Sequence, residues 1–561
     1  MTIRSCLEKF ARETPAAVAL EYYCRKKTWV TRSWSDFLAG VRAVAETYGP
    51  KFGLKPRTEL VAQILPNGPD WMEAYLACAG AGVGVVPIDP KLHDEEVAYI
   101  LRDSAAVVVT TDRAHLDMMR AIVPGLPALR AVVIAEGGGG AFDAIGSVPV
   151  YDYDALRADG VARLKDGAAA WYDAEVARPE DVASVIYTSG TTGRPKGAMI
   201  THGNFVADVD GALRAFGARV DQTDSVFVVL PLFHAFSFCA NFMLGLYRGV
   251  TMKINRSLYT VGEDVKILQP TVVMSVPLLA EKMFDKIDSK LRASKSARIL
   301  KAIGLGFLVR RSVVKGLGGK LRFMITGGAP CPVHVIEGFR RLGIAMLEGY
   351  GLTECSPVVS IANPKFAKAG SIGVKLPNID VRLADANEQG VGELQVRGPV
   401  TMKGYWHNEA ATREAFDGPW LKTGDLARID PDGQIWICGR KKALIVNREG
   451  KNIYPEEVEN RIAGDPFVAD CVVVGYTSGG LPGEKVGCVV HPDTDLLKAE
   501  RGGVELPWEE IERRAVERVH VRCQDLADYK RVRKVVVSKT PLERTSIQKV
   551  RRVAYKGALD E

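Results

Sequence analysis

The feature that most constrains this fold is the run Y-T-S-G-T-T-G-R-P-K-G-A-M-I-T-H at 187–202, together with the residues just before it. The apolar stretch 182–187 predicts a buried strand. In the run that follows, glycines let backbone N–H groups converge on an anion, hydroxyls donate to phosphate oxygens, and lysine supplies a mobile positive charge. We therefore expect a polyphosphate-binding loop at the carboxyl end of a strand, where open α/β sheets bind ligands.

The residues expected to contact phosphate are Thr188, Ser189, Gly190, Thr191, Thr192, Gly193 and Lys196. A surface loop rich in Ser, Thr and Gly is the plainer alternative. The loop of P-loop NTPases is a second alternative, but in that motif lysine directly precedes Ser or Thr at a helix start. Here Gly197 follows Lys196, which excludes that alternative.

Length and periodicity indicate a multidomain α/β protein. A chain of 561 residues is too long for one ordinary core, and 47% hydrophobic and 25% charged residues are globular values. Apolar residues at helical spacing predict a short opening helix, and alternating strands and helices after it predict a mainly parallel sheet covered by helices. The predicted strands are 60–65, 85–88, 106–110, 226–234 and 321–326, and predicted helices begin at Asp70 and Asp94. The stretch 137–179 is interpreted as a loose excursion.

Charge and cysteine usage exclude several classes. A net charge of +7 is modest for this length, and an anionic ligand such as ATP or coenzyme A accounts for it, so no nucleic-acid partner is expected. The ten cysteines include no C-x-x-C pair, which indicates reduced, mostly buried residues of a cytoplasmic protein. No signal peptide is apparent, and the apolar stretch 226–247 is interrupted by polar residues and proline before it could span a membrane.

Two further stretches carry nucleotide chemistry. Small residues at 327–330, after a predicted strand, could let a flat ring lie close to the backbone. In the sequence E-G-Y-G-L-T-E at 348–354, an aromatic ring that can stack on a base, a hydroxyl that can meet a phosphate and a carboxylate that can hold Mg²⁺ occur within five residues. An ordinary turn followed by a helix start is the plainer alternative.

These motifs together resemble the adenylate-forming superfamily, which groups acyl-CoA synthetases, peptide-synthetase adenylation domains and luciferases. The passages 231–234, 241–249 and 318–330 look most like bacterial long-chain fatty acyl-CoA ligases. The resemblance implies a large N-terminal AMP- and acyl-binding domain of helix-covered, mainly parallel sheets plus a small β-barrel-like part. It also implies a hinge and a small, mobile α+β C-terminal domain. The three parts are expected at 1–438, 439–442 and 443–561.

The resemblance assigns roles residue by residue. It places Tyr350 on adenine, Thr353 at the α-phosphate, Glu354 on Mg²⁺ and Asp425 on the ribose hydroxyls, with a turn-forming aspartate as the alternative for Asp425. Further implied residues are Gly328, Ala329, Pro330, Gly349 and Gly351 at the nucleotide, Arg440 at the ribose or phosphate, Lys442 as the hinge, Gly450 at the thiol tunnel, Lys451 at a phosphate of coenzyme A, and Lys549 as the adenylation lysine. A surface lysine is the alternative for Lys451.

His234 lies among aromatic residues, where a packing histidine is the plainer interpretation. The resemblance favours a histidine near the substrate rather than a general base. The chain also departs from the family pattern at several positions: Ala443 follows the hinge where an acidic residue is common, Arg448 and Glu449 replace small residues, and Gln548 replaces glycine.

The implied reaction is ATP-dependent activation of a medium- to long-chain fatty acid to an acyl-adenylate, followed by thioester formation with coenzyme A. The expected cofactors are ATP, Mg²⁺ and coenzyme A. Alternatives within the enzyme class are a fatty acyl-[acyl-carrier-protein] ligase and an aryl-CoA ligase, and an alternative outside it is a catalytically silent nucleotide-binding protein. Both a monomer and a homodimer remain open.

A basic stretch at 289–320 contains nine Lys or Arg residues and no Asp or Glu, with large apolar residues interspersed. A solvated basic helix face explains this pattern. A surface that binds anionic lipid is the sharper hypothesis, and it suits an enzyme that collects fatty acids at membranes.

Overall fold

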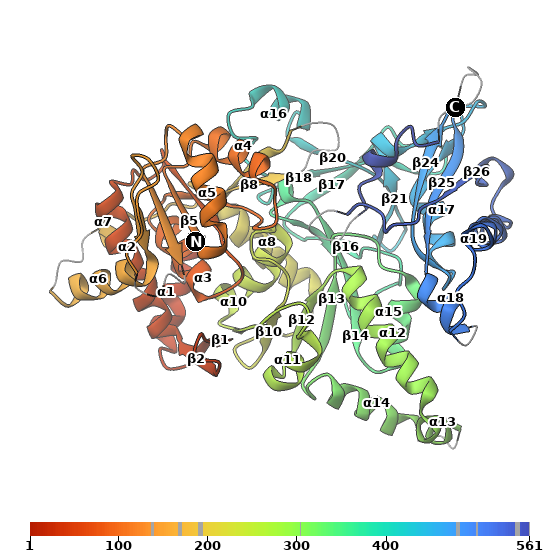
Figure 1. The fold of residues 1–561 in the computed structure, drawn as a ribbon, viewed down its shortest axis with the longest axis horizontal. Helices are drawn as coiled ribbons and strands as arrows, with labels where there is room; N and C mark the ends of the chain where they lie inside the picture. Colours follow the sequence, from red (N-terminus) through yellow and green to blue (C-terminus); the bar gives the residue numbers. More distant parts are fainter. Residues whose placement is uncertain are drawn as a thin grey trace. The chain divides into compact units, whose positions relative to one another are not determined.

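The computed structural model describes residues 1–135, 138, 140–166, 171–188, 194–302, 305–477, 483–500, 503–544 and 550–559 (Figure 1). The chain divides into two compact units. The first comprises 1–380 and 396–421, and the second comprises 381–395 and 422–561. The division at 439–442 proposed from the sequence stays a prediction.

One sheet of the first unit carries the predicted phosphate loop. Its strand order is β7 (Val150–Asp152), β6 (Ala131–Ala135), β5 (Val108–Asp112), β3 (Leu60–Ile64), β4 (Gly84–Pro87), β8 (Val182–Thr188) and β9 (Lys196–Thr201). The strands from β7 to β8 run parallel, and β9 returns antiparallel to β8. Valine, isoleucine and alanine dominate these strands, and the core around them is buried, as expected of a sheet covered on both faces.

The second sheet of this unit carries the remaining nucleotide motifs. Its order is β16 (Val374–Lys375), β15 (Val358–Ile361), β14 (Ala345–Gly351), β13 (Phe323–Thr326), β12 (Val272–Ser275), β10 (Ser225–Val228), β11 (Thr251–Ile254), β1 (Val18–Tyr23) and β2 (Trp29–Ser33). The strands from β14 to β1 are parallel, and the edges are antiparallel. Strand β10 ends before Pro231, earlier than predicted, because proline cannot donate to a ladder.

Most helices of this unit pack around these sheets, and those at 295–302 and 306–316 project at its periphery (Figure 1). The longer ones are α1 (Ile3–Glu13), α2 (Trp34–Phe52), α3 (Pro69–Gly80), α4 (Asp94–Ser104), α5 (Leu116–Ile122), α6 (Tyr153–Lys165), α8 (His202–Phe216), α11 (Val261–Leu268), α12 (Pro277–Ala293), α13 (Lys295–Ala302), α14 (Gly306–Gly316), α15 (Val333–Arg341) and α16 (Glu409–Ala415). The predicted opening helix is confirmed as α1. No described helix combines the length and apolarity needed to cross a membrane.

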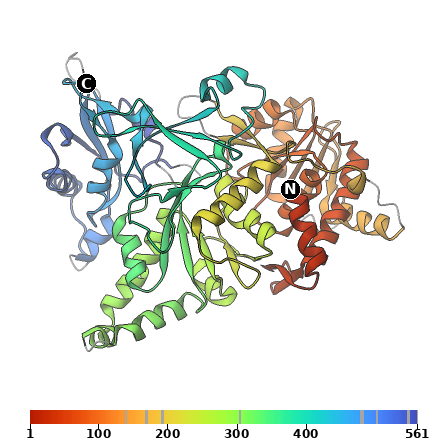
Figure 2. The ribbon, with the colours of Figure 1, turned by 180° about the vertical axis from the view of Figure 1, so that it is seen from behind.

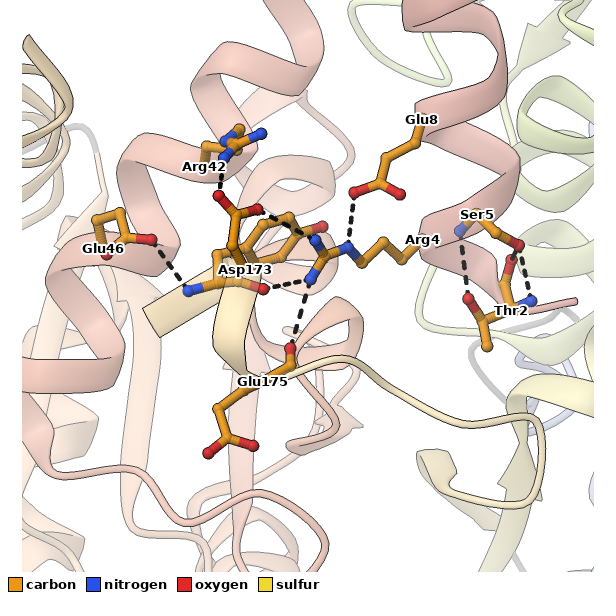
Figure 3. Close-up of polar contacts among 9 residues, drawn as sticks. Thr2, Arg4, Ser5, Glu8, Arg42, Glu46, Asp173 and Glu175 are labelled. Atoms are coloured by element: carbon orange, nitrogen blue, oxygen red, sulfur yellow. Dashed lines mark hydrogen bonds and ion pairs between the residues drawn. The ribbon is translucent and has the colours of Figure 1, made fainter. Parts of the chain in front are cut away.

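Arg4 ties the opening helix to a segment far along the sequence, as Figure 3 shows. Its guanidinium lies 3.9 Å from the centre of the Tyr172 ring and donates to the carbonyl oxygens of Tyr172 and Glu175. It also pairs with Glu8 at 2.7 Å within its own helix and with Asp173 at 3.4 Å. These contacts satisfy an arginine that is almost fully buried, so helix α1 is fixed to its unit by charge as well as by apolar packing.

The loose excursion expected at 137–179 is wrong for much of its length. Strand β7 extends the first sheet, and helix α6 packs against α2. Gly160 permits this approach, since a Cβ there would lie 1.8 Å from the carbonyl oxygen of Ala43. Helix α6 buries little apolar surface, so its sequence shows no clear apolar stripe.

The second unit is smaller and contains several antiparallel pairs. Its strands are β17 (Asp380–Ala384), β18 (Gly392–Arg397), β20 (Trp420–Ile429), β21 (Ile435–Arg440), β22 (Ile445–Val446), β23 (Asn452–Ile453), β24 (Val468–Tyr476), β25 (Lys485–Pro492) and β26 (Lys534–Val537), some of which run across the division. Helices α17 (Pro455–Ile462), α18 (Thr494–Glu500) and α19 (Trp508–Cys523) complete it, and α17 and α19 pack with β24 and β25 around an apolar core. The expected fold class, α/β with mainly parallel sheets and a smaller C-terminal α+β domain, is confirmed.

Candidate functional site

The predicted phosphate loop connects two antiparallel strands. Thr188 ends β8 and lies opposite Lys196, which begins β9. Residues 189–193, which include five of the residues expected to contact phosphate, lie outside the described part of the chain. The loop therefore follows the carboxyl end of a sheet strand, as predicted, and returns into a strand rather than a helix.

Helix α4 fixes both flanks of this loop. Before the loop, the Tyr187 hydroxyl donates to Asp103 Oδ2 at 2.6 Å. After it, the Tyr99 hydroxyl donates to the carbonyl oxygen of Pro195 at 3.1 Å, and the guanidinium of Arg194 lies 5.5 Å from the centre of the Tyr99 ring. Tyr99 and Asp103 are one helical turn apart, so a single helix face holds the two ends together. Sequence reasoning missed both residues because nothing local links them to the loop.

The two other nucleotide motifs lie at the carboxyl ends of neighbouring parallel strands. Residues 327–330 follow β13, and residues 349–351 end β14, which pairs with it. A Cβ on Gly327 would meet the carbonyl oxygen of Gly349 at 3.1 Å and the ring of Phe236 at 3.3 Å. Gly328 has φ +85°, in the left-handed region that favours glycine. The segment containing His234 thus reaches the end of β13, where residues 327–330 begin.

The turn after β14 is too tight for any side chain at Gly351. A Cβ there would lie 1.8 Å from the carbonyl oxygen of Pro357, which directly precedes the returning strand β15. Thr353 and Glu354 lie within this turn, in the short 3₁₀ helix η4 (Thr353–Cys355). The close backbone approach therefore sets where the predicted phosphate and metal ligands lie.

Tyr405 connects the turn to the lysine of the phosphate loop. Its hydroxyl donates to Glu354 Oε1 at 2.9 Å, and Lys196 Nζ lies 5.4 Å from the centre of its ring. The structure thus brings together two predicted site residues that are 158 positions apart in the sequence, through a third residue to which the sequence assigned no role. Burial, and then the neighbouring carboxylate, raise the pKa of Tyr405 well above its usual value, so its hydroxyl remains a donor.

His234 caps the short helix α9 (Ala235–Ser237), where its Nδ1 accepts the backbone N–H of Phe236 at 3.3 Å. Burial lowers the pKa of this imidazole to about 4. The ring is therefore neutral near pH 7, with its proton on Nε2 while Nδ1 accepts. This state suits a residue beside the substrate better than a general base, which should titrate near the working pH.

In the second unit, Asp425 and Arg440 face each other across the antiparallel pair β20–β21. Arg440 Nε lies 2.9 Å from Asp425 Oδ1. Asp425 is 3% exposed, and its backbone N–H donates to the hydroxyl of Thr423 at 3.1 Å. The arginine thus compensates a buried carboxylate, and the two predicted ribose contacts form one charge pair.

The predicted hinge and thiol-tunnel residues also lie in the second unit. Lys442 is exposed within the 3₁₀ turn η5 (Lys441–Ala443), and the neighbouring Lys441 pairs with Glu393 at 2.8 Å. Gly450, with φ +74°, and Lys451 lie in the turn between β22 and β23. Lys451 pairs with Glu449 at 2.7 Å, and its ammonium lies 4.9 Å from the centre of the Tyr529 ring.

Lys549 lies outside the described residues, although both flanks of its segment are described. Arg544 and Val550 form an isolated antiparallel bridge, and Arg544 pairs with Asp470 at 2.7 Å. Beyond the bridge, Arg552 pairs with Glu456 and Glu459 at 2.8 and 2.7 Å. The chain on either side of 545–549 is therefore held in the second unit.

Comparison with known proteins agrees with the family that the sequence motifs resemble. The model of the AMP-binding enzyme family matches residues 7–406. The long-chain-fatty-acid–CoA ligase FadD15 of Mycobacterium bovis is 34% identical over 448 residues, covering 72% of this chain and 69% of that protein. The peroxisomal long chain acyl-CoA synthetase 7 of Arabidopsis thaliana is 30% identical over 508 residues, covering 84% and 68% respectively.

Among solved structures, the crystal structure of the anthranilate CoA ligase AuaEII in complex with anthranoyl-AMP matches with a TM-score of 0.78. The match covers 100% of this chain and 97% of that one at 21% identity, which is a likeness of fold. Because the family model covers well over half of its residues, the chain belongs to the AMP-binding enzyme family.

Proposed function

We propose that this protein is an acid–thiol ligase that activates a medium- to long-chain fatty acid with ATP and transfers the acyl group to coenzyme A. The observation that carries the proposal is that Tyr405 contacts both Lys196, at the start of β9, and Glu354, in the turn that follows β14. A lysine and a carboxylate that share one tyrosine as neighbour suit a polyphosphate and its cation. The relatives, which are named as long-chain acyl-CoA ligases and synthetases, support the class of acid.

The reaction proceeds by two displacements. A carboxylate oxygen of the fatty acid attacks the α-phosphorus of ATP, the bond from that phosphorus to the bridging oxygen breaks, and pyrophosphate leaves. The thiol sulfur of coenzyme A then attacks the acyl carbon, its proton passes to solvent, and AMP leaves. Both nucleophiles belong to substrates, so the protein mainly positions the reactants, excludes water and stabilises developing charge.

Roles for the site residues follow from this chemistry. Tyr350 packs on adenine beside the glycines of 327–330, and Asp425 and Arg440 hold the ribose. Thr353 meets the α-phosphate, while Lys196 and the loop at 188–193 hold the β- and γ-phosphates. His234 lies beside the acyl group. Gly450 and Lys451 receive coenzyme A, and Lys549 acts in adenylation.

Mg²⁺ fits the donor set around Glu354. Magnesium is commonly bound by one or two carboxylates together with substrate phosphates, rather than by a cage of protein ligands. Among the described residues no cluster of three or more His, Cys, Asp or Glu could hold a metal alone. Glu354 Oε1 accepts from Tyr405, while Oε2 has no hydrogen-bond partner within the described part of the chain. Bound there with ATP, the cation would neutralise phosphate charge.

The decisive experiment is ATP–pyrophosphate exchange across carboxylic acids of increasing chain length, followed by thioester assays. Exchange that depends on aliphatic chain length, with coenzyme A as acceptor, is the expected result. Preference for aromatic acids would favour an aryl-CoA ligase, and thioester formed only on acyl-carrier protein would favour that type of ligase. Absence of exchange with every acid would contradict the proposal and favour a silent nucleotide-binding protein.

Lys442→Pro should separate the two half-reactions. On the proposed mechanism the C-terminal part turns about Lys442 between adenylation and thiolysis. Proline fixes φ near −65° and restricts the backbone of the preceding residue, so the rotation of the C-terminal part should be blocked. We expect acyl-adenylate formation to continue while thiolysis falls at least about tenfold. Single-turnover assays of each half-reaction measure this. Lys442→Ala is the control, because it removes the charge and keeps the backbone free to rotate. Equal losses in both half-reactions would contradict the hinge.

We further propose that helices α13 and α14 contact anionic membranes when the enzyme collects its substrate. The two helices lie at the periphery of the first unit in both views (Figures 1 and 2). Phe307 is 59% exposed and Ile299 60% exposed, beside exposed Arg310, Arg311 and Lys315. Exposed large apolar side chains among exposed positive charges suit a lipid surface that offers negative headgroups and an apolar interior.

Vesicle sedimentation tests this contact. The protein should bind vesicles containing acidic lipid more strongly than neutral ones, and less strongly as salt increases. Reversing Arg310, Arg311 and Lys315 to glutamate should weaken binding to acidic vesicles about 100-fold, because each basic residue near such a surface contributes about 1 kcal/mol. Equal binding to neutral vesicles at all salt concentrations would contradict the proposal.

A further inference from the structure

A short segment of the first unit, 402–406, lies between the strand that carries Lys196 and the turn that carries Glu354. On one side, the backbone N–H of Trp406 donates to the carbonyl oxygen of Gly197 at 2.7 Å, and residue 405 forms a bridge with Ala198. On the other side, the N–H of Met402 donates to the carbonyl oxygen of Glu354 at 2.8 Å. The backbone of this segment therefore holds both functional elements before any side chain is considered.

The side chain of Tyr405 makes the same connection at the functional atoms. Its ring faces the ammonium of Lys196, and its hydroxyl reaches the carboxylate of Glu354. Its own backbone N–H donates to the hydroxyl of Thr412 at 2.9 Å, which fixes the residue from a third direction. Tyr405 therefore has little freedom to choose another partner.

We propose that Tyr405 is a positioning residue that orients Glu354 for the cation and Lys196 for the phosphates, so that both act on one magnesium–nucleotide complex. The inference rests on the proposed function and assigns a role to a residue for which the motifs gave none. The hydroxyl occupies Oε1 of the carboxylate and so directs Oε2 toward the cation. The ring, through its negative face, holds the lysine.

This assignment separates the roles of the two parts of one side chain. The hydroxyl acts through the carboxylate, so its removal should affect only the contribution of the cation to nucleotide binding. The ring acts through the lysine, so its removal should weaken nucleotide binding with or without the cation. A purely structural tyrosine would show neither separation.

A matched control exists elsewhere in the same unit. The hydroxyl of Tyr247, on α10 (Leu244–Arg248), donates to Asp210 Oδ1 on α8 at 2.9 Å, the same distance as in the Tyr405–Glu354 pair. Both are partly buried tyrosine–carboxylate pairs, but the partner of Tyr247 is not among the predicted site residues. Tyr247→Phe therefore removes an equivalent hydrogen bond without touching the nucleotide site.

The experiment measures nucleotide affinity in the full chain, without fatty acid or coenzyme A. The dissociation constant of ATP is determined with excess Mg²⁺ and with a chelator, and the ratio of the two reports the contribution of the cation. In Tyr405→Phe the gain from Mg²⁺ should shrink about tenfold, as expected when a hydrogen bond to a charged group is lost, while affinity in chelator stays near wild type. Tyr247→Phe should leave both constants unchanged.

Further variants complete the test. Tyr405→Leu should also weaken binding in chelator, because the ring is lost as well. Glu354→Gln should reduce the gain from Mg²⁺, and adding Tyr405→Phe to it should cause no further reduction, because the two residues act as one unit. An unchanged Mg²⁺ gain in Tyr405→Phe, or an equal loss in Tyr247→Phe, would overturn the inference. Since no acid is present, these outcomes are independent of whether the protein activates fatty acids.

Discussion

Replacement of Lys549 by alanine should lower the rate of acyl-adenylate formation about 10²–10³-fold, while thiolysis of a supplied acyl-adenylate continues near the wild-type rate. Negative charge moves onto pyrophosphate during adenylation, and a lysine aimed at that charge stabilises the transition state. Thiolysis expels AMP rather than pyrophosphate, and on the proposed hinge motion about Lys442 the lysine has left the reacting atoms before that step. The effect should therefore fall on one half-reaction.

The measurement is a pair of single-turnover assays, one following adenylate formation and the other following thioester formation from supplied adenylate. Lys556→Ala is a suitable control, because Lys556 is an exposed lysine close to Lys549 in the sequence. The bridge between Arg544 and Val550 should preserve the backbone on either side in both variants. Equal reduction of the two half-reactions would show that Lys549 does not act in adenylation alone.

Gly351→Ala should reduce adenylation about 100-fold, although the added group is a single methyl. Its Cβ would lie 1.8 Å from the carbonyl oxygen of Pro357, so the turn must open by more than an ångström. Thr353 and Glu354 lie inside that turn and would move with it. A displacement of this size is enough to disrupt transition-state positioning, and the strain should also destabilise the unit by about 1–3 kcal/mol.

ATP–pyrophosphate exchange and denaturant unfolding measure the two effects. Gly349→Ala, two residues earlier in the same strand, is the stability control, because its Cβ would find its nearest neighbour at 3.6 Å. We expect that variant to unfold near the wild-type midpoint. If Gly351→Ala were as stable as Gly349→Ala and retained exchange, the turn would be more adaptable than the structure indicates.

Local patterns predicted the elements well where the chain is apolar and regular. The strands at 60–65 and 182–187 appear as β3 and β8. The sequence D-P-D-G at 430–433, which is typical of a hairpin turn, joins β20 to β21. Hydrophobic periodicity failed to predict helix α6, where Gly160 allows close packing although the helix has no apolar stripe. Periodicity predicts which faces of an element are apolar. It gives no indication of packing that depends on the absence of a side chain, as at a glycine.

The candidate site divides in the same way. Lys196, Thr353 and Glu354 could be proposed from short motifs because each motif carries its chemistry within a few residues. Tyr405 could not, since its partners are separated from it by 51 and more than 200 positions, and only folding brings them together. The pairing of Asp425 with Arg440 likewise follows from the register of two strands, which the turn at 430–433 sets.

The second unit consists of two separate stretches of the chain, 381–395 and 422–561. This division affects the design of chimeras in which the unit is exchanged between relatives. Glu393 and Leu394, from the shorter stretch, contact Lys441 and Thr423 of the longer one at 2.8 and 2.6 Å. A chimera joined at a single point near 422 would build this unit from residues 381–395 of one parent and residues 422–561 of the other. Such hybrids should lose these contacts where the parents differ at residue 393, 423 or 441, because the contact at Leu394 is made by its backbone carbonyl oxygen. Grafting both stretches together should restore them.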